Sequence, residues 1–409
     1  MSKYETAKSR LAALGQEHVL NFYGELSADE QDALISQVLE LDFSCLDALK
    51  NEAPEKGRGV ISPLTAMQIP EIEARREEFT AAGVKAIKNG EIAAVLLAGG
   101  MGTRLGSDAP KGMYDIGVTR PVFIFERLIA NLLDVVRETD TMIHLLIMTS
   151  EKNDAATRTF LAEHDYFGYD PKYVTFFMQD AAPCTDFDGK ILLEDRSRIA
   201  TSPNGNGGWF ATMLRQGIVK RLEAAGVKWL NVFAVDNVLQ RIADPAFIGA
   251  VLLSGCASGS KVVRKAGRDE KTGVMCLEDG RPSVIEYTEM TDELLDAKNE
   301  DGEPAYNFGV ILNYLFNMEE LVRVANEDLS LHIARKKIPH IDDKGNKIAP
   351  LEPNGCKFEL FILDLVKKLP GCLPYEVVRN KEFAPIKNKT GVDSVESARG
   401  LCRLNGIAL

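Results

Sequence analysis

The feature that most constrains this fold is an uninterrupted apolar stretch, residues 92–98, that runs directly into two glycines. Apolar runs without polar alternation are typical of strands that are buried on both faces of a parallel sheet. Similar runs predict further strands over residues 144–148, 174–178 and 229–235. Because helical patterns separate these runs, we expect an α/β fold whose central sheet is covered on both faces.

The helices expected around this sheet follow from residue spacing and from capping residues. Residues 121–138, 151–164 and 208–225 have helical patterns, and Ser150 is the expected cap of the second helix. These helices alternate with the predicted strands along the chain. That alternation is typical of a largely parallel sheet.

The first 90 residues are predicted to be mostly helical and contain no obvious chemistry. Ser27 and Glu30 have the spacing of a capping box ahead of an apolar helical face. Another helix is predicted over residues 71–88. We therefore expect a helical N-terminal region over residues 1–90.

Predicted strands lie closer together in the second half of the chain. Residues 261–264, 274–277 and 284–287 are expected to form antiparallel strands, with Asp279-Gly280 as a turn. They suggest a small lobe within a second region, residues 91–330, that also contains the sheet. A C-terminal region of mixed pattern is expected over residues 331–409.

Charge and hydropathy exclude two classes of partner. The net charge is −12 and the sequence has no basic run, which argues against nucleic-acid binding. Residues 1–10 are polar and lack the apolar core of a signal peptide. The longest apolar runs, 92–98 and 142–148, are far shorter than the roughly 20 residues that cross a bilayer. We therefore expect a cytoplasmic protein without nucleic-acid or membrane partners.

The strongest chemical signal is the string that follows the first predicted strand. It reads Leu97-Ala98-Gly99-Gly100-Met101-Gly102-Thr103-Arg104-Leu105-Gly106 and is followed by Pro110-Lys111-Gly112. Ligands of open α/β sheets bind beyond strand ends, where glycines permit positive φ angles and close backbone approach. Consecutive N–H groups can cradle phosphate oxygens there, and Arg104 and Lys111 add positive charge. The string therefore predicts a phosphate-binding loop.

This string differs from two common phosphate-binding motifs. Lys111 is followed by Gly112, so the spacing of a P-loop is missing. Gly100 and Gly102 fit the dinucleotide fingerprint, but Leu105 stands where that motif needs a third glycine. A plain glycine-rich turn would explain the glycines but not the lysine that follows them.

The string resembles those of the sugar nucleotidyltransferases, and the chain resembles the eukaryotic UDP-N-acetylhexosamine pyrophosphorylases. The resemblance rests on an ordered series of motifs along nearly the whole chain. The series is Glu25-Leu26-Ser27, Met113-Tyr114-Asp115-Ile116-Gly117, Phe187-Asp188-Gly189-Lys190-Ile191, Pro203-Asn204-Gly205-Asn206-Gly207-Gly208, Val235-Asp236-Asn237, Asp244-Pro245-Ala246-Phe247-Ile248-Gly249, Lys261-Val262-Val263, Val284-Ile285-Glu286-Tyr287, Lys336-Lys337-Ile338-Pro339, Pro353-Asn354-Gly355 and Phe383-Ala384-Pro385-Ile386-Lys387-Asn388.

The resemblance implies a Rossmann-like (GT-A-like) nucleotidyltransferase fold with a mixed sheet core. It also implies an enzyme that converts UTP and a sugar 1-phosphate into a UDP-sugar and pyrophosphate. N-acetylglucosamine 1-phosphate is the expected sugar 1-phosphate. A phosphate monoester is already anionic near neutral pH, so no general base is expected. Catalysis would then consist of positioning and charge neutralisation.

The resemblance further implies roles for individual residues on the nucleotide side. The UTP phosphates would be held by Gly99, Gly100, Gly102, Thr103 and Arg104. Lys111 would neutralise charge on the departing pyrophosphate, and Lys387 would reach the phosphates from the C-terminal region. Gln179 would bond the uracil edge, because an amide both donates and accepts. The backbone of Gly205 would touch the uracil.

Other residues would hold the sugar and a metal ion. The sugar would contact Asn206, Gly273, Glu286 and Asn307. Asp236 follows a predicted strand, where a carboxylate can hold Mg²⁺ against phosphate oxygens. From the residues alone, Asp236-Asn237 could equally be explained as a turn, because Asp and Asn are common turn residues. The resemblance favours the metal, so Mg²⁺ is the expected cofactor.

Several alternatives stay open at the level of sequence. Phe308-Gly309-Val310 replaces a stretch that is usually Ala-Gly-Asn, so Phe308 would occupy space meant for an acetamido group. Glucose or galactose 1-phosphate therefore stays open as the substrate. A UDP-sugar-dependent glycosyltransferase is a rival, although Asn237-Val238 after Asp236 breaks the usual DxD metal motif. A non-catalytic nucleotide-sugar sensor is another, and the expected assembly is a monomer or weak homo-oligomer.

Overall fold

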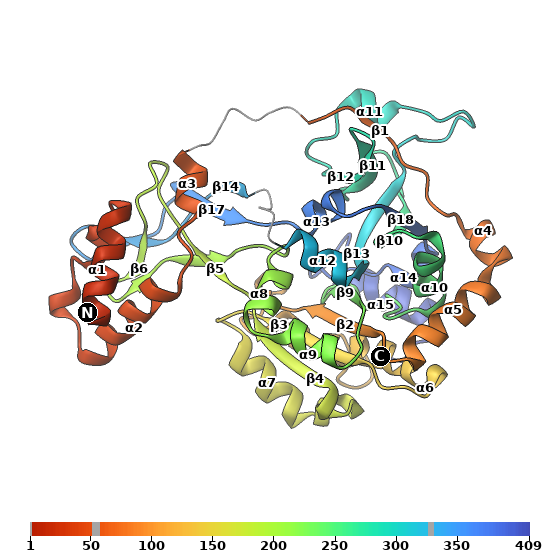
Figure 1. Ribbon diagram of the computed structural model, residues 1–409, viewed down its shortest axis with the longest axis horizontal. Coiled ribbons are helices and arrows are strands. Elements are labelled where there is room, and N and C mark those ends of the chain that lie inside the picture. Colours follow the sequence, from red (N-terminus) through yellow and green to blue (C-terminus); the bar gives the residue numbers. More distant parts are fainter. Residues whose placement is uncertain (1, 51–57, 326–330) are drawn as a thin grey trace. The chain divides into compact units, whose positions relative to one another are not determined.

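The chain forms two compact units in the computed structural model, which describes residues 2–50, 58–325 and 331–409 (Figure 1). The first unit is built from residues 1–57, 180–208 and 329–362. The second unit contains the rest of the chain. Each unit is therefore assembled from separate stretches of sequence. The units cut across the three consecutive regions expected from the sequence, whose boundaries stay a prediction.

The helices of the first unit come from the N-terminal stretch. They are α1 (Lys3–Leu14), α2 (Ala28–Glu40) and α3 (Cys45–Lys50), with short 3-10 turns at Glu17–Leu20 and Tyr23–Glu25. α2 begins at the predicted capping box, in which the Ser27 N–H donates to Glu30 Oε2 at 2.9 Å. The Glu30 N–H donates in return to Ser27 Oγ, so this prediction is confirmed.

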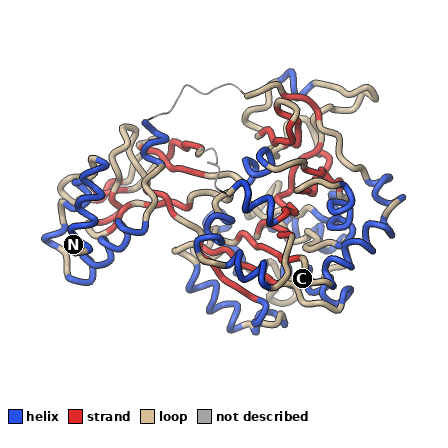
Figure 2. The backbone as a smooth tube through the Cα atoms, viewed as in Figure 1, coloured by secondary structure: helices blue, strands red, loops and turns tan. Residues whose placement is uncertain are grey.

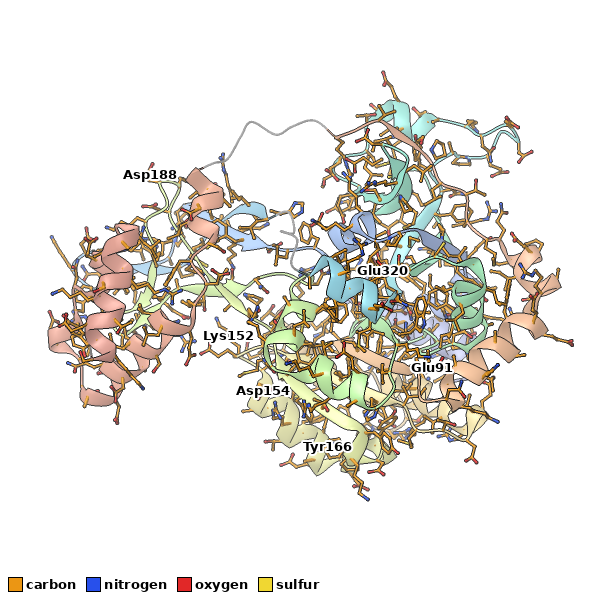
Figure 3. The ribbon with its side chains drawn as sticks, viewed as in Figure 1. Glu91, Lys152, Asp154, Tyr166, Asp188 and Glu320 are labelled. Atoms are coloured by element: carbon orange, nitrogen blue, oxygen red, sulfur yellow. The ribbon has the colours of Figure 1, made fainter. Side chains whose placement is uncertain are left out.

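The strands of the first unit pair in antiparallel two-stranded sheets. These pairs are β5 (Ala181–Pro183) with β8 (Thr201–Pro203), β6 (Leu193–Asp195) with β7 (Arg198–Ile199), β14 (His332–Lys336) with β17 (Gly355–Glu359), and β15 (His340–Ile341) with β16 (Lys347–Ile348). A turn follows β5, where Figure 3 labels Asp188. Gly189 has a φ of 85° in this turn, and Thr185 bridges Ile191 across it. Leu11, Leu34 and Phe358 lie fully buried in the apolar core of this unit.

A mixed sheet, ten-stranded among the described residues, organises the second unit. Its main path is β1-β11-β13-β9-β2-β3-β4, with β12 beside β11 and with β10 paired to β13 and β18. The strands are β1 (Ile61–Pro63), β2 (Ile92–Leu97), β3 (His144–Thr149), β4 (Val174–Met178), β9 (Trp229–Ala234), β10 (Ser258–Arg264), β11 (Val274–Glu278), β12 (Arg281–Ile285), β13 (Phe308–Asn317) and β18 (Cys372–Glu376). β9, β2, β3 and β4 run parallel, and β13 runs antiparallel to β9. The predicted α/β fold with a mixed sheet is confirmed.

The parallel strands are those that the apolar runs predict. Val95 in β2 is fully buried and pairs with Leu146 on one side and Val232 on the other. Lys228 Nζ lies 2.8 Å from Glu91 Oε1 where β9 and β2 begin, and Figure 3 labels Glu91 there. The carboxyl ends of these strands therefore lie at the opposite edge, where the glycine string starts.

Helices flank this sheet (Figure 2). They are α4 (Ile69–Ala74), α5 (Arg76–Lys88), α6 (Ile124–Thr139), α7 (Asp154–Glu163), α8 (Trp209–Arg215), α9 (Ile218–Ala224), α10 (Pro245–Ser254), α11 (Asp292–Asp296), α12 (Met318–Val324), α13 (Ile362–Lys368), α14 (Arg379–Glu382) and α15 (Val395–Leu404). Short 3-10 turns lie at Thr103–Leu105, Lys111–Met113, Asp165–Gly168 and Pro171–Tyr173. In the part of the chain that the structure describes, no helix has the length and apolar character needed to cross a lipid bilayer.

Two helices of this unit touch backbone to backbone. A Cβ atom added to Gly83 in α5 would lie 1.9 Å from the carbonyl oxygen of Pro245 in α10. A Cβ atom added to Gly249 in α10 would lie 1.8 Å from the carbonyl oxygen of Phe79 in α5. Both glycines are therefore required by the close approach of the two helices.

Two helices predicted as continuous are interrupted. The helix predicted over residues 71–88 is split into α4 and α5 at Arg75, which has a φ of −120°. The helix predicted over residues 208–225 is split into α8 and α9 before Gly217, which has a φ of 67°. The left-handed conformation of Gly217 ends the helical hydrogen bonding there. The helix predicted from residue 121 begins at Ile124.

The lobe beside the parallel strands is only partly as predicted. β11 and β12 form the expected antiparallel hairpin, and Gly280 has a φ of 75° at its turn. β13 is missing from the sequence prediction, although it joins β9 to β11 and β10. β1 and β18, which extend the sheet, are also missing from it.

Candidate functional site

One edge of the sheet gathers most of the predicted site residues. Because β2, β4 and β9 point the same way, Gly99, Gln179 and Asp236 follow strand ends at the same edge. β13 runs antiparallel to β9, so Asn307, which precedes β13, also lies at this edge. Ligands of α/β sheets bind beyond the carboxyl ends of the parallel strands.

The backbone of the glycine string turns back, so Lys111 lies beside Gly100. The Lys111 N–H donates to the Gly100 carbonyl at 3.1 Å, and the Gly102 N–H donates to the Ala109 carbonyl at 2.9 Å. Met101 and Pro110 form an antiparallel bridge between these two bonds. The backbone of the loop thus fixes Lys111 beside the glycines, as the contiguous string predicts.

Two polar residues hold this loop from the neighbouring strand. Ser150 Oγ donates to the Gly99 carbonyl at 2.9 Å, and Asn153 Nδ2 donates to the Ala98 carbonyl at 2.9 Å. The prediction that Ser150 caps a helix from residue 151 was wrong. α7 starts at Asp154, labelled in Figure 3, and the Ser150 hydroxyl is engaged by the glycine loop instead.

The loop glycines serve close packing more than unusual backbone angles. Only Gly106 in the string has a positive φ, 75°, so the expectation of positive φ for the other glycines was wrong. A Cβ atom on Gly99 would lie 2.2 Å from Gln179 Nε2, so the Gln179 amide rests on this glycine. A Cβ atom on Gly100 would have no heavy atom within 4 Å, which leaves its backbone open to a ligand.

The resemblance implies that the Gln179 amide reads the uracil of UTP. Gly99→Ala is therefore expected to raise the KM for UTP by ~10-fold while turnover changes less, because the added methyl group displaces that amide. Thermal unfolding should change little, since the clash falls on the end of a flexible side chain. Steady-state kinetics and a melting curve measure both quantities. Gly400→Ala is the control, because a Cβ atom there meets nothing within 4 Å. An unchanged KM for UTP in Gly99→Ala would remove Gln179 from the nucleotide site.

Three cations and one carboxylate interact at this edge. Lys111 Nζ lies 3.6 Å from Asp236 Oδ2, and the two side chains are 16% and 25% exposed. Burial lowers the pKa of Lys111, the Asp236 carboxylate opposes this shift, and Arg104 and Lys387 lower the pKa further by repulsion. The predicted phosphate-binding cations therefore lie close enough to affect one ionisation. A polyanionic ligand would relieve their mutual repulsion.

Lys387 reaches this edge through the backbone that follows β9. The Ile386 N–H donates to the Asp236 carbonyl at 2.9 Å, which places the next residue, Lys387, beside Asp236. Lys387 Nζ lies 3.2 Å from Asp393 Oδ2. Asp393 is absent from the predicted site, because nothing in the local sequence links it to a phosphate.

The predicted sugar-binding residues of the second unit come from three adjacent strand ends. Gly273 precedes β11, Glu286 follows β12, and Asn307 precedes β13. A Cβ atom on Gly273 would lie 3.4 Å from Glu286 Oε1, so these two residues are in contact. The side-chain oxygen of Asn307 accepts a hydrogen bond from the Lys265 N–H at 3.2 Å.

Gly205 and Asn206 belong to the first unit, whereas the other predicted site residues belong to the second unit. Gly205 has a φ of 84°, and a Cβ atom on it would lie 2.3 Å from the Leu360 carbonyl oxygen. Asn206 Oδ1 accepts a hydrogen bond from the Ile362 N–H at 3.0 Å. Packing against this neighbouring segment explains why the turn needs a glycine, and its contacts with a nucleotide stay a prediction.

Asp236 is the carboxylate at this edge that the sequence predicts to hold a metal ion. Among the described residues, no group of three His, Cys, Asp or Glu side chains is arranged to hold a metal. Mg²⁺ is usually held by one or two carboxylates together with substrate phosphates. Asp236 fits that chemistry, because its oxygens are hard ligands and its side chain is 25% exposed beside phosphate-binding cations.

Comparison with known proteins identifies the family. A family model described as UTP–glucose-1-phosphate uridylyltransferase matches residues 57–401. The chain belongs to that family. UDP-N-acetylglucosamine pyrophosphorylase of Saccharomyces cerevisiae is 37% identical over 415 residues, 94% of this chain and 86% of that protein. UDP-N-acetylhexosamine pyrophosphorylase-like protein 1 of Mus musculus is 34% identical over 96% of this chain and 82% of that protein.

A solved structure leads to the same uridylyltransferase family. The uridine diphosphate N-acetylglucosamine pyrophosphorylase from Trypanosoma brucei, in complex with an inhibitor, has a TM-score of 0.86 and 29% identity. The match covers 98% of this chain and 84% of that chain. The protein is therefore a nucleotidyltransferase, and the resemblance stated from the sequence motifs is confirmed.

Proposed function

We propose that this uridylyltransferase-family member joins UTP and N-acetylglucosamine 1-phosphate to give UDP-N-acetylglucosamine and pyrophosphate. The observation that carries the proposal is Lys111 beside Asp236 at the carboxyl edge of the sheet, with Arg104 and Lys387 close enough to repel the Lys111 ammonium group. The names of the yeast and trypanosome relatives support N-acetylglucosamine as the sugar.

The proposed reaction is an in-line displacement at phosphorus. An oxygen of the sugar 1-phosphate bonds to the α-phosphorus of UTP while the bond to the bridging oxygen of the β-phosphate breaks. The attacking oxygen is already anionic, so no proton is removed and no protein nucleophile is needed. Lys111 stabilises the negative charge that grows on the leaving pyrophosphate, an interaction stronger in the transition state than in bound UTP.

Mg²⁺ is the proposed cofactor, with Asp236 as the protein ligand that would hold it. When bound, it supplies charge neutralisation at the phosphate oxygens. The accessible carboxylate at the end of β9 supports this assignment. Arg104, Lys111 and Lys387 orient the phosphates and share in neutralising them.

The position of Phe308 bears on the choice between an N-acetylated sugar and a plain hexose. Its ring is only 8% exposed, and the Arg264 guanidinium carbon lies 5.3 Å from the ring centroid. Side chains alternate across a strand, so Phe308 points to the opposite face of β13 from Gly309. Gly309 faces the segment before β11, since a Cβ atom on it would lie 2.7 Å from Thr272 Cγ2. A Cβ atom on Gly273 would instead lie 3.5 Å from Val310 Cγ2, so Gly273 meets the face of β13 that carries Val310 and Phe308. The position of Phe308 therefore does not select the sugar, and the acetamido sugar is proposed on the names of the relatives.

A pyrophosphate-release assay with Mg²⁺ and UTP tests the proposal. It is run in parallel with the 1-phosphates of N-acetylglucosamine, N-acetylgalactosamine, glucose and galactose. We expect kcat/KM for N-acetylglucosamine 1-phosphate to exceed that for either plain hexose by ~10-fold or more, a typical discrimination for one missing group. Excess EDTA should stop release.

Other outcomes of this assay would correct the proposal in defined ways. Release with plain hexoses alone would keep the reaction class and change the sugar. Silence with every sugar phosphate, from folded protein that binds UTP, would favour the nucleotide-sugar sensor. Sugar transfer from UDP-N-acetylglucosamine to an added acceptor, without pyrophosphate release from UTP, would favour the glycosyltransferase.

The proposal includes a cytoplasmic location and a monomer or weak homo-oligomer, without nucleic-acid or membrane partners. The net charge of −12 supports the absence of a nucleic-acid partner. Size-exclusion chromatography with light scattering over a range of protein concentrations measures the assembly.

A further inference from the structure

We propose that Asn237 is a positioning residue that fixes Lys387 relative to Asp236. This inference rests on the proposed function, in which Lys387 reaches the phosphates and Asp236 holds Mg²⁺. In this proposal the Asn237 side chain does not bind a substrate. The Asn237 side chain binds residues 382–386 to the residues that follow strand β9.

The Asn237 amide contacts the distant segment with both of its ends. Nδ2 donates to the Glu382 carbonyl at 2.7 Å, and Oδ1 accepts from the Ala384 N–H at 2.9 Å. The side chain is 1% exposed, so both bonds are shielded from water. An amide is suited to this role, because it presents a donor and an acceptor on one planar group. Neither aspartate nor leucine supplies both.

Backbone bonds extend the same attachment toward the site. The Val238 N–H donates to the Ala384 carbonyl at 3.4 Å, and the Ile386 N–H donates to the Asp236 carbonyl at 2.9 Å. Asn237 and Pro385 form an antiparallel bridge between these bonds. The segment from Glu382 to Ile386 is thus laid along the residues that follow β9. Lys387 is the next residue after that attachment.

The segment is also anchored at both of its ends. Before it, the Glu382 carboxylate lies 2.6 Å from the fully buried Lys261 Nζ. After it, the Lys387 N–H donates to the Asp393 carbonyl at 2.6 Å. These anchors hold the segment to the fold, and the bonds of Asn237 and its neighbours set its register against Asp236. Loss of the amide should therefore shift Lys387 without unfolding the segment.

A double-mutant cycle tests whether Asn237 acts through Lys387. We expect Asn237→Leu to lower turnover by ~10- to 100-fold, the size of effect that follows when a catalytic group is misplaced by about 1 Å. In the Lys387→Ala background the same substitution should lower turnover by less than ~3-fold, because residues that act as a unit are not additive. Equal losses in both backgrounds would overturn the proposal.

Asn231→Leu, within β9 itself, is the matched control. Asn231 is also 1% exposed, and its amide also bonds at both ends. Nδ2 donates to Asn313 Oδ1 at 2.8 Å and to the Tyr314 carbonyl at 2.9 Å, and Oδ1 accepts from the Ala243 N–H at 2.7 Å. It has no contact with the segment that carries Lys387 among the hydrogen bonds of the described residues. Its effect on turnover should be the same in the wild-type and Lys387→Ala backgrounds.

Hydrogen exchange followed by mass spectrometry measures how firmly the segment is held, and it does not require an active enzyme. Peptides covering residues 383–394 should exchange faster in Asn237→Leu than in Asn231→Leu, both measured without UTP. Unchanged exchange in these peptides would overturn the positioning role even if the enzyme used another substrate. An inactive wild-type enzyme with faster exchange in Asn237→Leu would instead count against the proposed function alone.

Discussion

Replacing Lys111 with alanine lowers turnover at least ~100-fold, which corresponds to ~2.7 kcal/mol of transition-state stabilisation. Lys111 is held by the glycine loop and by its 3.6 Å contact with Asp236, so its ammonium group is fixed before the reaction begins. A fixed charge contributes most where negative charge grows, which is the leaving pyrophosphate. Turnover at saturating UTP and sugar 1-phosphate is the quantity to measure.

Two comparisons make this prediction about Lys111 specific. Lys172→Ala removes an exposed lysine from the second unit and should leave turnover unchanged. The KM for UTP should rise less in Lys111→Ala than turnover falls, because the interaction is strongest in the transition state. A folded Lys111→Ala enzyme with near-normal turnover would take this residue out of catalysis.

Replacing Lys261 with methionine costs about 3–5 kcal/mol of the free energy of unfolding, since it leaves two carboxylates buried without their cation. Lys261 is fully buried, with Nζ 2.9 Å from Asp244 Oδ2 and 2.6 Å from Glu382 Oε2. Methionine has a similar volume, so the loss reports charge rather than a cavity. Trp209 and Trp229 both belong to the second unit, so tryptophan fluorescence in urea follows the unfolding of this unit.

The pH dependence of the Lys261→Met loss has a definite sign. In the wild type, burial opposes ionisation of Asp244, but Lys261 and Arg241 outweigh it and hold the pKa of Asp244 below its ordinary value. Burial raises the pKa of Glu382 despite Lys261. Without Lys261 both carboxyl pKa values rise above their unfolded values, so the folded state binds protons more readily. The difference in stability between wild type and variant should therefore be smaller at pH 5 than at pH 8.

Lys228→Met is the control for the Lys261 prediction. Lys228 Nζ lies 2.8 Å from Glu91 Oε1, but its side chain is 63% exposed. An exposed ion pair contributes about 1 kcal/mol or less, and the contribution is screened by salt. Equal losses for the two lysines, or a gap that widens at low pH, would contradict the buried-charge explanation.

Local patterns predicted the centre of the fold well. β2 is a continuous apolar run in which every residue is buried, as a strand covered on both faces requires. β3, β4 and β9 are apolar apart from one or two polar residues each. The glycine loop and Lys111 lie in one contiguous string, so their proximity follows from the chain itself. The interruption of a predicted helix at Arg75 has no such local signal, because no glycine or proline marks it.

Contacts between distant residues were beyond what the sequence predicted. Gly83 and Gly249 look like ordinary helix glycines, and only the packing of α5 on α10 shows why a side chain cannot fit. Asp393 beside Lys387 and Asn153 beneath the glycine loop are polar residues without a motif. Their roles depend on which segments the fold places together, and that information is not carried by spacing along the chain.

Because each unit is built from separate stretches of sequence, the ribosome synthesises the parts of one site at different times. A nascent chain of about 300 residues already contains the glycine loop and Asp236, but not the strand β18 or the segment that attaches Lys387 after β9. The first unit likewise waits for β14 and β17, which form one of its two-stranded sheets. The stretches that complete the two units, residues 329–362 and 363–409, are therefore synthesised one directly after the other. A translation product that stops before residue 387 contains Arg104 and Lys111 but lacks Lys387, so it has an incomplete set of cations at the site.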